Sequence, residues 1–260
     1  MLATFSHKGD SRVIATAIHN GHELSPEVEE IIALSEATRL REEDPFTGEI
    51  VADFVKSVVV HRSRFEVDLN RERENAVYRT PAEAWGLELW KQDPDDDLVN
   101  KSLALYDSFY TNLKLTLDQM VEIQGGFVLY DIHSYNHRRQ GPESPPEDQS
   151  GNPTVNLGTR TLPGKWRPVA DSFLEAMRSH ELDGAGIDIR ENVRFEGGEL
   201  TAFVHDEYGD LGCALAVELK KVFMDEWTGE LYPDTHRQLG NALLATVDPV
   251  ATAWSSSVGT

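Results

Sequence analysis

The stretch GFVLYDIHS, residues 126–134, decides the fold class. Apolar, β-branched and aromatic side chains fill almost all of it, and it ends in His133 and Ser134. A nearly continuous apolar run, in contrast to an alternating one, is typical of a strand that is buried on both faces of a sheet. The stretch therefore predicts a central strand of an α/β protein, with polar groups at its carboxyl end.

The residues before this strand predict one long helix over 97–124. An apolar stripe with helical spacing runs along it, and the glycine pair at 125–126 ends it. Because such stripes usually cover a core, we expect this helix to pack on the sheet. The residues of the stripe are Leu103, Tyr106, Tyr110, Leu113, Leu117, Met120 and Val121.

Further from the central strand, strand and helix patterns alternate along the chain. Ser25 and Pro26 are typical of a helix start, and this helix is expected to continue until the break at Asp44–Pro45. The remaining helices are expected at 48–57, 81–91, 166–180 and 234–250, and strands at 12–19, 57–61, 64–69, 154–159, 186–192, 201–207 and 213–221. This order predicts a single three-layer α/β/α domain over 1–260, with a central mixed, mostly parallel sheet and a Pro- and Gly-rich loop at 141–153.

Composition excludes several classes of protein. The formal net charge is −21, from 45 acidic and 24 basic residues, so general binding to the phosphate backbone of nucleic acids is not expected. The chain has no apolar run near the ~20 residues that a membrane helix needs, and no secretory signal. Its one cysteine, Cys213, excludes a disulfide framework, and we expect a cytoplasmic protein. The acidic excess fits either an ordinary soluble surface or a salt-rich cytoplasm.

Polar groups at the ends of three predicted strands indicate a catalytic site. His19 and His133 each end a strand, and Glu218 lies within the apolar strand CALAVEL. Carboxyl ends of parallel strands are where open α/β sheets bind ligands, and two imidazoles with a carboxylate suit catalytic zinc. Satisfied polar histidines, and a Glu218 that pairs with Lys220 or Lys221, are the structural alternatives.

Asp131 is a further candidate, because it lies two residues before His133 and hence on the same strand face. Its carboxylate can orient the imidazole through the ring nitrogen that does not face the metal. A solvent-facing or capping carboxylate is the alternative.

Taken in order, several segments resemble the N-formylglutamate amidohydrolase family. The family belongs with the zinc carboxypeptidase-like hydrolases, which include the succinylglutamate desuccinylases and aspartoacylases. The order of these segments along the chain is specific for the family, although a single dipeptide within them is not. The matching segments are IHNGHELSP (18–26), EDPFTG (43–48), SRFEVDLNR (63–71), YDIHSYNHRR (130–139), NLGTR (156–160), ENVRFEGGEL (191–200) and VELKKVFMDEWTGE (217–230).

The resemblance implies amide hydrolysis with one Zn²⁺ ion, although another divalent transition metal can occupy such a site. His19 and His133 look like the histidine ligands, and Glu218 resembles the general base. Asn70 and Arg71 look like the pair that holds the carboxylate of the substrate, since an arginine fork binds a carboxylate in bidentate fashion.

The third metal ligand departs from the desuccinylase pattern. In those relatives a glutamate lies three residues after the first histidine, whereas here that position is His22 and Glu23 follows it. Asp44 resembles the Asp-Pro step of the formylglutamate family. We therefore expect Asp44 to be the ligand, with Glu23 and His22 as alternatives.

The arginines complete the expected site. Arg62 or Arg64 is expected to stabilise the oxyanion, and Arg138 or Arg139 to hold a second carboxylate. Tyr135 in HSYNHRR resembles the carboxypeptidases rather than the formylglutamate pattern. The expected substrate is thus a small carboxylate-bearing N-acyl amino acid like N-formylglutamate. The alternatives are another N-acyl amino acid or short peptide, or a non-catalytic binder of acidic metabolites.

Overall fold

In the computed structural model, which describes residues 1–258, a mixed sheet of seven strands forms the centre of the molecule. The strand order is β1 (Ala3–His7), β3 (Lys56–Val60), β2 (Val13–Ala17), β4 (Phe127–Tyr135), β9 (Gly212–Lys220), β5 (Val155–Gly158) and β8 (Ile189–Glu191). Strands β3, β2, β4 and β9 are parallel neighbours, while β1 pairs antiparallel with β3 and β5 pairs antiparallel with β9. The predicted mixed, mostly parallel sheet is confirmed.

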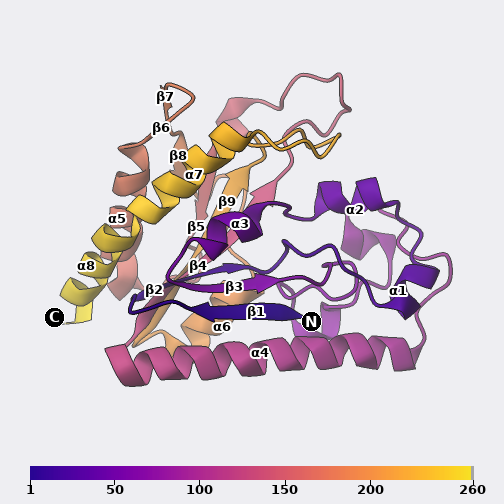
Figure 1. Ribbon diagram of the computed structural model, residues 1–260, viewed down its shortest axis with the longest axis horizontal. Coiled ribbons are helices and arrows are strands. Elements are labelled where there is room, and N and C mark those ends of the chain that lie inside the picture. Colours follow the sequence, from indigo (N-terminus) through magenta and orange to yellow (C-terminus); the bar gives the residue numbers. More distant parts are fainter. Residues whose placement is uncertain (259–260) are drawn as a thin grey trace.

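Helices cover both faces of this sheet (Figure 1). Helices α4 (Asp96–Gln124) and α6 (Glu199–Tyr208) pack on one face. The other face is covered by α3 (Thr47–Ala52), α5 (Arg167–Arg178), α7 (Pro233–Ala245) and α8 (Val247–Val258). Two short helices, α1 (Pro26–Ile31) and α2 (Glu36–Glu42), lie beyond the carboxyl ends of the parallel strands, and a small hairpin joins β6 (Glu181–Leu182) to β7 (Ala185–Gly186).

Strand β4 shows why its sequence is almost continuously apolar. Phe127 and Leu129 pack under α4 and α6, whereas Val128, Tyr130 and Ile132 pack under α5 and α8. Every residue of β4 is buried, so neither face of the strand offers a position for a solvated side chain. Gly125 ends α4 with φ of 78°, a left-handed conformation that glycine adopts without strain.

Two expected strands are wrong. Residues 201–207 lie in α6, because Leu200, Val204 and Tyr208 recur every four residues and together face the core below the sheet. Residues 64–69 form turns rather than a strand. No strand of residues 1–258 pairs with the segment, and residues 65–69 are all buried without alternation, the charged Glu66 and Asp68 included.

Four expected helices also differ. The helix expected at 48–57 is shorter, because α3 ends at Ala52 and Lys56 and Ser57 belong to β3. The helix expected from Ser25 is divided into α1 and α2, since Ser35 caps a second start, although Ser25 caps the first as predicted. Residues 81–91 hold only a 3-10 turn, Pro81–Ala84, after which Trp85 takes φ of 54°. The last expected helix is two helices, α7 and α8, which meet at Thr246.

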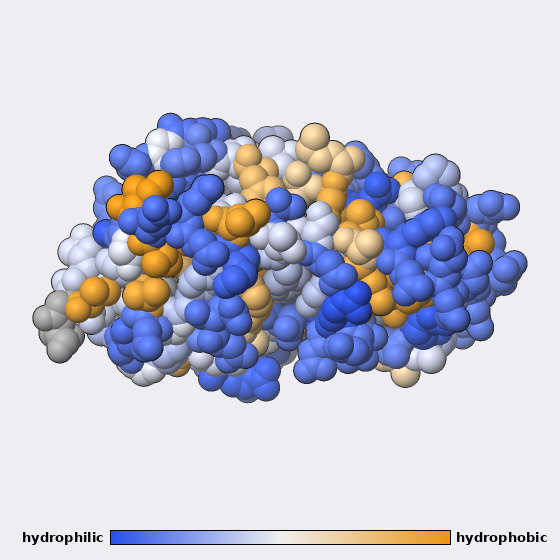
Figure 2. All heavy atoms as spheres, turned by 90° about the horizontal axis from the view of Figure 1, so that it is seen from below, coloured by the Kyte–Doolittle hydropathy of each residue, from blue (hydrophilic) through white to orange (hydrophobic). Residues whose placement is uncertain are grey.

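The outer surface agrees with the acidic composition. Figure 2 shows the face that carries α4 as mostly hydrophilic, with hydrophobic residues in separate patches. Leu115 and Ile123 are the large apolar side chains that α4 exposes. Among residues 1–258, helices with the length and apolarity of a membrane span are absent.

Candidate active site

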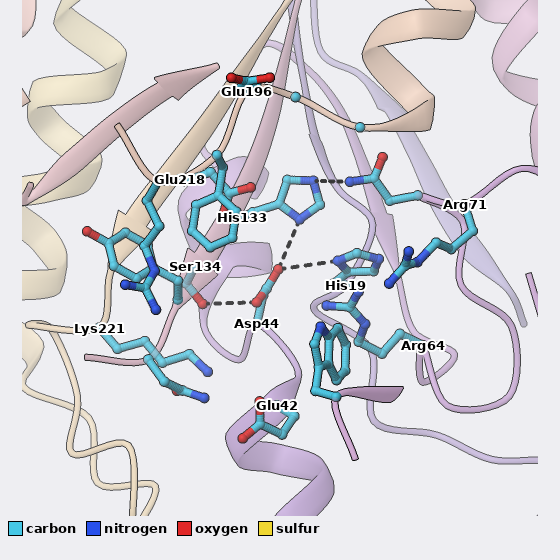
Figure 3. A pocket seen from close by; sticks show the side chains of 18 of the residues that line it. His19, Glu42, Asp44, Arg64, Arg71, His133, Ser134, Glu196, Glu218 and Lys221 are labelled. Atoms are coloured by element: carbon cyan, nitrogen blue, oxygen red, sulfur yellow. Dashed lines mark hydrogen bonds and ion pairs between the residues drawn. The ribbon is translucent and has the colours of Figure 1, made fainter. Parts of the chain in front are cut away.

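The parallel strands bring the predicted polar groups to one edge of the sheet. His19 follows β2, and His133 of β4 lies opposite Glu218 of β9 in the strand register. Asp44 follows α2, and its backbone N–H donates to the carbonyl of His19 at 2.9 Å. His19, Asp44 and His133 thereby offer one ligand atom each within 4.8 Å of one another (Figure 3).

The carboxylate of Asp44 lies between the two imidazoles. Its Oδ2 is 3.0 Å from Nδ1 of His133 and 3.5 Å from Nδ1 of His19. Its Oδ1 accepts a hydrogen bond from Ser134 Oγ at 3.2 Å. All three residues of the cluster are buried, so water does not screen their interaction.

Two further buried carboxylates hold the far sides of the imidazole rings. Nε2 of His19 is 2.7 Å from Asp68, and Nε2 of His133 is 2.9 Å from Asp131, which Thr16 also contacts at 3.0 Å. A proton on Nε2 of His19 donates to Asp68 and leaves the Nδ1 lone pair of that ring directed at the cluster. Asp131 lies beside Nε2 of His133 as an ion-pair partner, but its Oδ2 accepts no hydrogen bond. Asp131 is on the same face of β4 as His133, as the sequence predicts.

The chemistry of the cluster fits a divalent metal ion. Burial opposes both charges, but Asp131 and Asp44 raise the pKa of His133 well above its usual range, and the two imidazoles hold the pKa of Asp44 low. Nδ1 of His19 is buried without a hydrogen-bond partner. Two imidazole nitrogens and one carboxylate, with a ring nitrogen unsatisfied, form a donor set that a cation such as Zn²⁺ completes.

Glu218 lines the same pocket as the cluster. Burial, with Asp44 and Asp131 adding to it and His133 opposing, raises its pKa to about 7. The expected alternative, an ion pair with either neighbouring lysine, is not formed within residues 1–258. Lys220 instead donates to Gln149 and to a carbonyl, and Lys221 donates to two carbonyls.

Asp68 connects the cluster of His19, Asp44 and His133 with the predicted substrate anchors. Besides contacting His19, it accepts the backbone N–H of Asn70 and the Nη2 group of Arg64, both at 2.8 Å. The hydroxyl of Tyr78 also donates to it. This carboxylate therefore fixes the segment DLNR relative to His19.

Asn70, Arg71 and Arg64 all line the pocket. The amide oxygen of Asn70 accepts the N–H of Leu200 at 3.1 Å. Arg71 is only loosely paired, since its Nε lies 3.8 Å from Asp68 and 43% of its side chain is exposed. The guanidinium of Arg64 lies 4.8 Å from the indole centroid of Trp85, and its Nε is unsatisfied.

Four of the sequence candidates lie outside this pocket. Arg62 is 3.5 Å from Glu66, and Arg138 points to Asp225, at 3.9 Å. The buried carboxylate of Glu43 binds Nδ1 of His22 and so holds it away from the cluster, while Glu23 is exposed. The placement favours Arg64 over Arg62, Arg139 over Arg138, and Asp44 over both His22 and Glu23.

Arg139 and Tyr135 do line the pocket, which encloses about 530 Å³. The residues of its wall that sequence reasoning missed include Trp85, Arg160, Arg194 and Lys221. Arg194 could have been found from the sequence, since it directly precedes the family-like segment FEGG, which leads into α6. It ties the pocket to the predicted loop, because it pairs with Glu147 at 3.1 Å.

Comparisons with known proteins agree with this arrangement. An N-formylglutamate amidohydrolase of Ralstonia eutropha JMP134 matches 98% of the chain and 99% of its own length, with a TM-score of 0.78 at 14% sequence identity. A gene product of Agrobacterium tumefaciens matches with a TM-score of 0.65 at 16% identity, over 98% of this chain and 94% of its own. At such identities the two structures show the fold alone. No match was found among curated protein sequences.

A sequence model of the family described as N-formylglutamate amidohydrolase matches residues 11–224. The matched region includes the cluster of His19, Asp44 and His133. It also includes Asn70, Arg71 and Glu218. The chain therefore belongs to the N-formylglutamate amidohydrolase family, whose members hydrolyse amide C–N bonds.

Proposed function

We propose that the chain is a zinc-dependent amidohydrolase that cleaves the amide of an N-acyl amino acid similar to N-formylglutamate. The observation that carries the proposal is the buried His19–Asp44–His133 cluster with Glu218 facing the same pocket. Family membership supports the reaction type, and the donor set supports zinc.

His19, Asp44 and His133 are the residues that would hold the ion. Zn²⁺ in such a site supplies a Lewis acid, which polarises a carbonyl and makes water more acidic. Asp68 keeps His19 in the tautomer that metal binding needs, and the charge of Asp131 lies beside the ring nitrogen of His133 that faces away from the ion.

Glu218 is the proposed general base. A carboxyl group with a pKa of about 7 is substantially ionised near neutral pH and still basic enough to accept a proton. It takes the proton of the attacking water as the C–O bond forms, and it delivers that proton to the nitrogen as the C–N bond breaks. The products are the free carboxylic acid of the acyl group and the amine of the amino acid.

Arg64, Asn70 and Arg71 have separate roles in this proposal. Arg64 is held by Asp68 and stabilises the negative charge that develops on the carbonyl oxygen. Arg71 is the better anchor for the α-carboxylate, because its guanidinium is largely free of other partners. Asn70 adds a neutral donor beside it.

A different N-acyl amino acid or a short peptide is the second candidate substrate. The size of the cavity, about 530 Å³, favours it, because a formyl group is the smallest acyl group and leaves much of that space unfilled. Tyr135 in the wall does not distinguish the two candidates, since its hydroxyl already donates to the carbonyl of Pro153.

The test combines metal analysis with a substrate panel. The purified protein should contain near-stoichiometric zinc and should hydrolyse N-formyl, N-acetyl or longer N-acyl amino acids that have a free α-carboxylate. Glu218→Gln should keep the metal and lose the activity. A metal-loaded wild type that hydrolyses none of these substrates would rule the proposal out in favour of a non-catalytic binder.

A further inference from the structure

Lys221 is a buried cation that the proposed mechanism does not use. It follows β9, is 1% exposed, and lines the pocket. Its Nζ donates to the carbonyls of Arg41 at 2.6 Å and Glu43 at 2.7 Å. Within residues 1–258 no carboxylate forms an ion pair with it, so one of its three donors is left for the pocket.

The neighbouring Lys220 shows what a purely structural lysine does in this fold. Its Nζ also has two neutral acceptors, Gln149 Oε1 and the carbonyl of Asn152, and it ties the 141–153 loop to β9. It does not line the pocket. The two lysines are therefore matched in burial and bonding, and they differ in whether the ammonium reaches the cavity.

Lys221 and Arg71 lie on opposite sides of the metal cluster. In Figure 3 the cluster of His19, Asp44 and His133 separates the two side chains. If Arg71 holds the α-carboxylate and the scissile amide lies at the cluster, the acyl group continues toward Lys221. A formyl group has nothing that extends there.

Other groups make the Lys221 side of the pocket cationic. Asn136 donates to the same carbonyl of Arg41 as Lys221 does, and this segment continues to Arg139, which lines the pocket without an ion pair among residues 1–258. The nearby carboxylate of Glu42 is already neutralised by Arg41. A ligand carboxylate would thus meet Lys221 and Arg139 without an opposing free acid on Glu42.

We propose that Lys221, with Arg139 of the same pocket, determines specificity by binding a carboxylate at the end of the acyl group of the substrate. Preferred substrates are then N-acyl amino acids whose acyl chain is itself a dicarboxylic acid. This inference rests on the proposed function, because the orientation of the substrate follows from the roles of Asn70 and Arg71. A buried ammonium favours such a ligand, since Asp44, Glu42 and Glu226 stabilise its charge only from a distance and no carboxylate of residues 1–258 pairs with it directly.

The test compares substrates that differ by one charge. N-succinyl amino acids carry the acyl carboxylate, and N-succinamoyl amino acids replace it with a neutral amide of nearly the same shape. Each is made with glutamate and with glutamine, so that charge on the amino-acid side chain varies independently. We expect wild-type kcat/KM to favour succinyl over succinamoyl by roughly 10- to 100-fold, the range for a charged hydrogen bond.

Lys221→Met should abolish the preference at the acyl group and leave the preference at the amino-acid side chain unchanged. Lys220→Met is the matched control and should retain both preferences. A wild type that does not distinguish succinyl from succinamoyl overturns the proposal, whether or not the variant folds. So does a Lys221→Met protein that loses all substrates equally, or that loses only the discrimination between glutamate and glutamine.

Binding measurements separate this inference from the proposed function. Succinate and its monoamide are titrated into wild type, Lys221→Met and Lys220→Met by calorimetry, which requires no turnover. Tighter binding of succinate that disappears only in Lys221→Met supports the subsite even if no amide is hydrolysed. Equal affinities of the wild type for the two ligands would overturn the subsite, and absence of hydrolysis alone would overturn only the proposed function.

Discussion

At the scale of single residues, Asp44 lies at the centre of the site, because one of its oxygens is near both imidazoles. Asp44→Asn removes the charge and should lose zinc, as should His19→Ala and His133→Ala. Glu23→Gln is the control and should keep the metal, since Glu23 is exposed and outside the pocket. Metal content, measured by plasma mass spectrometry, shows which of these variants lose the metal. Greater loss in Glu23→Gln than in Asp44→Asn would move the ligand to Glu23.

Glu218 allows a prediction about rate and pH. Glu218→Gln preserves shape and should lower kcat by roughly 10²–10⁴-fold, the usual contribution of a positioned acid–base group, while zinc and fold are retained. The base is the ionised form, so activity should fall as the pH drops through its pKa. That pKa is about 7 without the metal, and a bound cation favours the carboxylate, so the acid limb of the holoenzyme should lie at or below this value.

The pH dependence of kcat/KM tests this assignment directly. The limb should be present in the wild type and absent from the residual activity of Glu218→Gln. An unchanged kcat in a folded, zinc-loaded Glu218→Gln protein would contradict the role.

Arg71 should distinguish substrates by their carboxylate. Lysine cannot reproduce the planar fork, so Arg71→Lys should cost about 1.5–3 kcal/mol in transition-state binding of substrates with a free α-carboxylate. The loss should be small for the same substrates capped as amides. Arg62→Lys, which changes an arginine outside the pocket, is the control. Equal losses on free and capped substrates would show that Arg71 is structural.

At the scale of elements, the turn before α6 positions Asn70. A Cβ built on Gly198 would come within 2.4 Å of the amide of Asn70, although the backbone there is ordinary. Gly198→Ala should therefore displace Asn70 and lower kcat/KM for substrates with a free α-carboxylate, by at least the ~10-fold expected of a lost hydrogen bond. Gly151→Ala, where no atom lies within 4 Å, should leave the kinetics unchanged. Wild-type kinetics in Gly198→Ala would contradict this packing argument.

Sequence patterns predicted the buried strands better than the short helices. Strands β2, β4 and β9 were predicted because burial on both faces leaves a continuous apolar run in each. Residues 201–207 were mistaken for a strand. The β-branched and aromatic residues there fit both the two-residue period of a strand and the 3.6-residue period of a helix. Only the packing of α6 on the sheet decides between the two. The division between α1 and α2 depends on Ser35, whose capping role competes with a helical apolar spacing that continues through it.

The site was predictable where it depends on strand ends. His19, His133 and Glu218 follow from the rule that parallel strands present their carboxyl ends at one edge. The choice of Arg64 over Arg62 did not follow, because the segment forms turns, in which alternation does not fix the direction of a side chain. Lys221 was considered only as a partner of Glu218, since the sequence does not show that the carbonyls of Arg41 and Glu43 lie beside it.

At the scale of the whole molecule, the cluster joins separate parts of the sheet. His19 and His133 end neighbouring strands, and Asp44 comes from the segment after α2. A ligand that binds only the native state stabilises it by mass action, by about 2.7 kcal/mol at one hundred times its dissociation constant. Chelation of zinc should therefore lower the melting temperature, and added zinc should restore it. His19→Ala, tested by the same scan, should show no shift on chelation.

The distance along the chain between the ligands has a consequence for how the protein acquires its metal. Asp44 and His133 are 89 residues apart in sequence, and they meet only after α4 has crossed the sheet and β4 has paired beside β2. A chain still being synthesised has His19 and Asp44 but lacks the third donor, so it would hold the proposed zinc ion weakly. Pairing of strands so distant in sequence is slow, because a long loop must close before any contact compensates for its lost entropy. On the proposed function, zinc would therefore enter a protein that is nearly folded and would stabilise it without guiding the nascent chain.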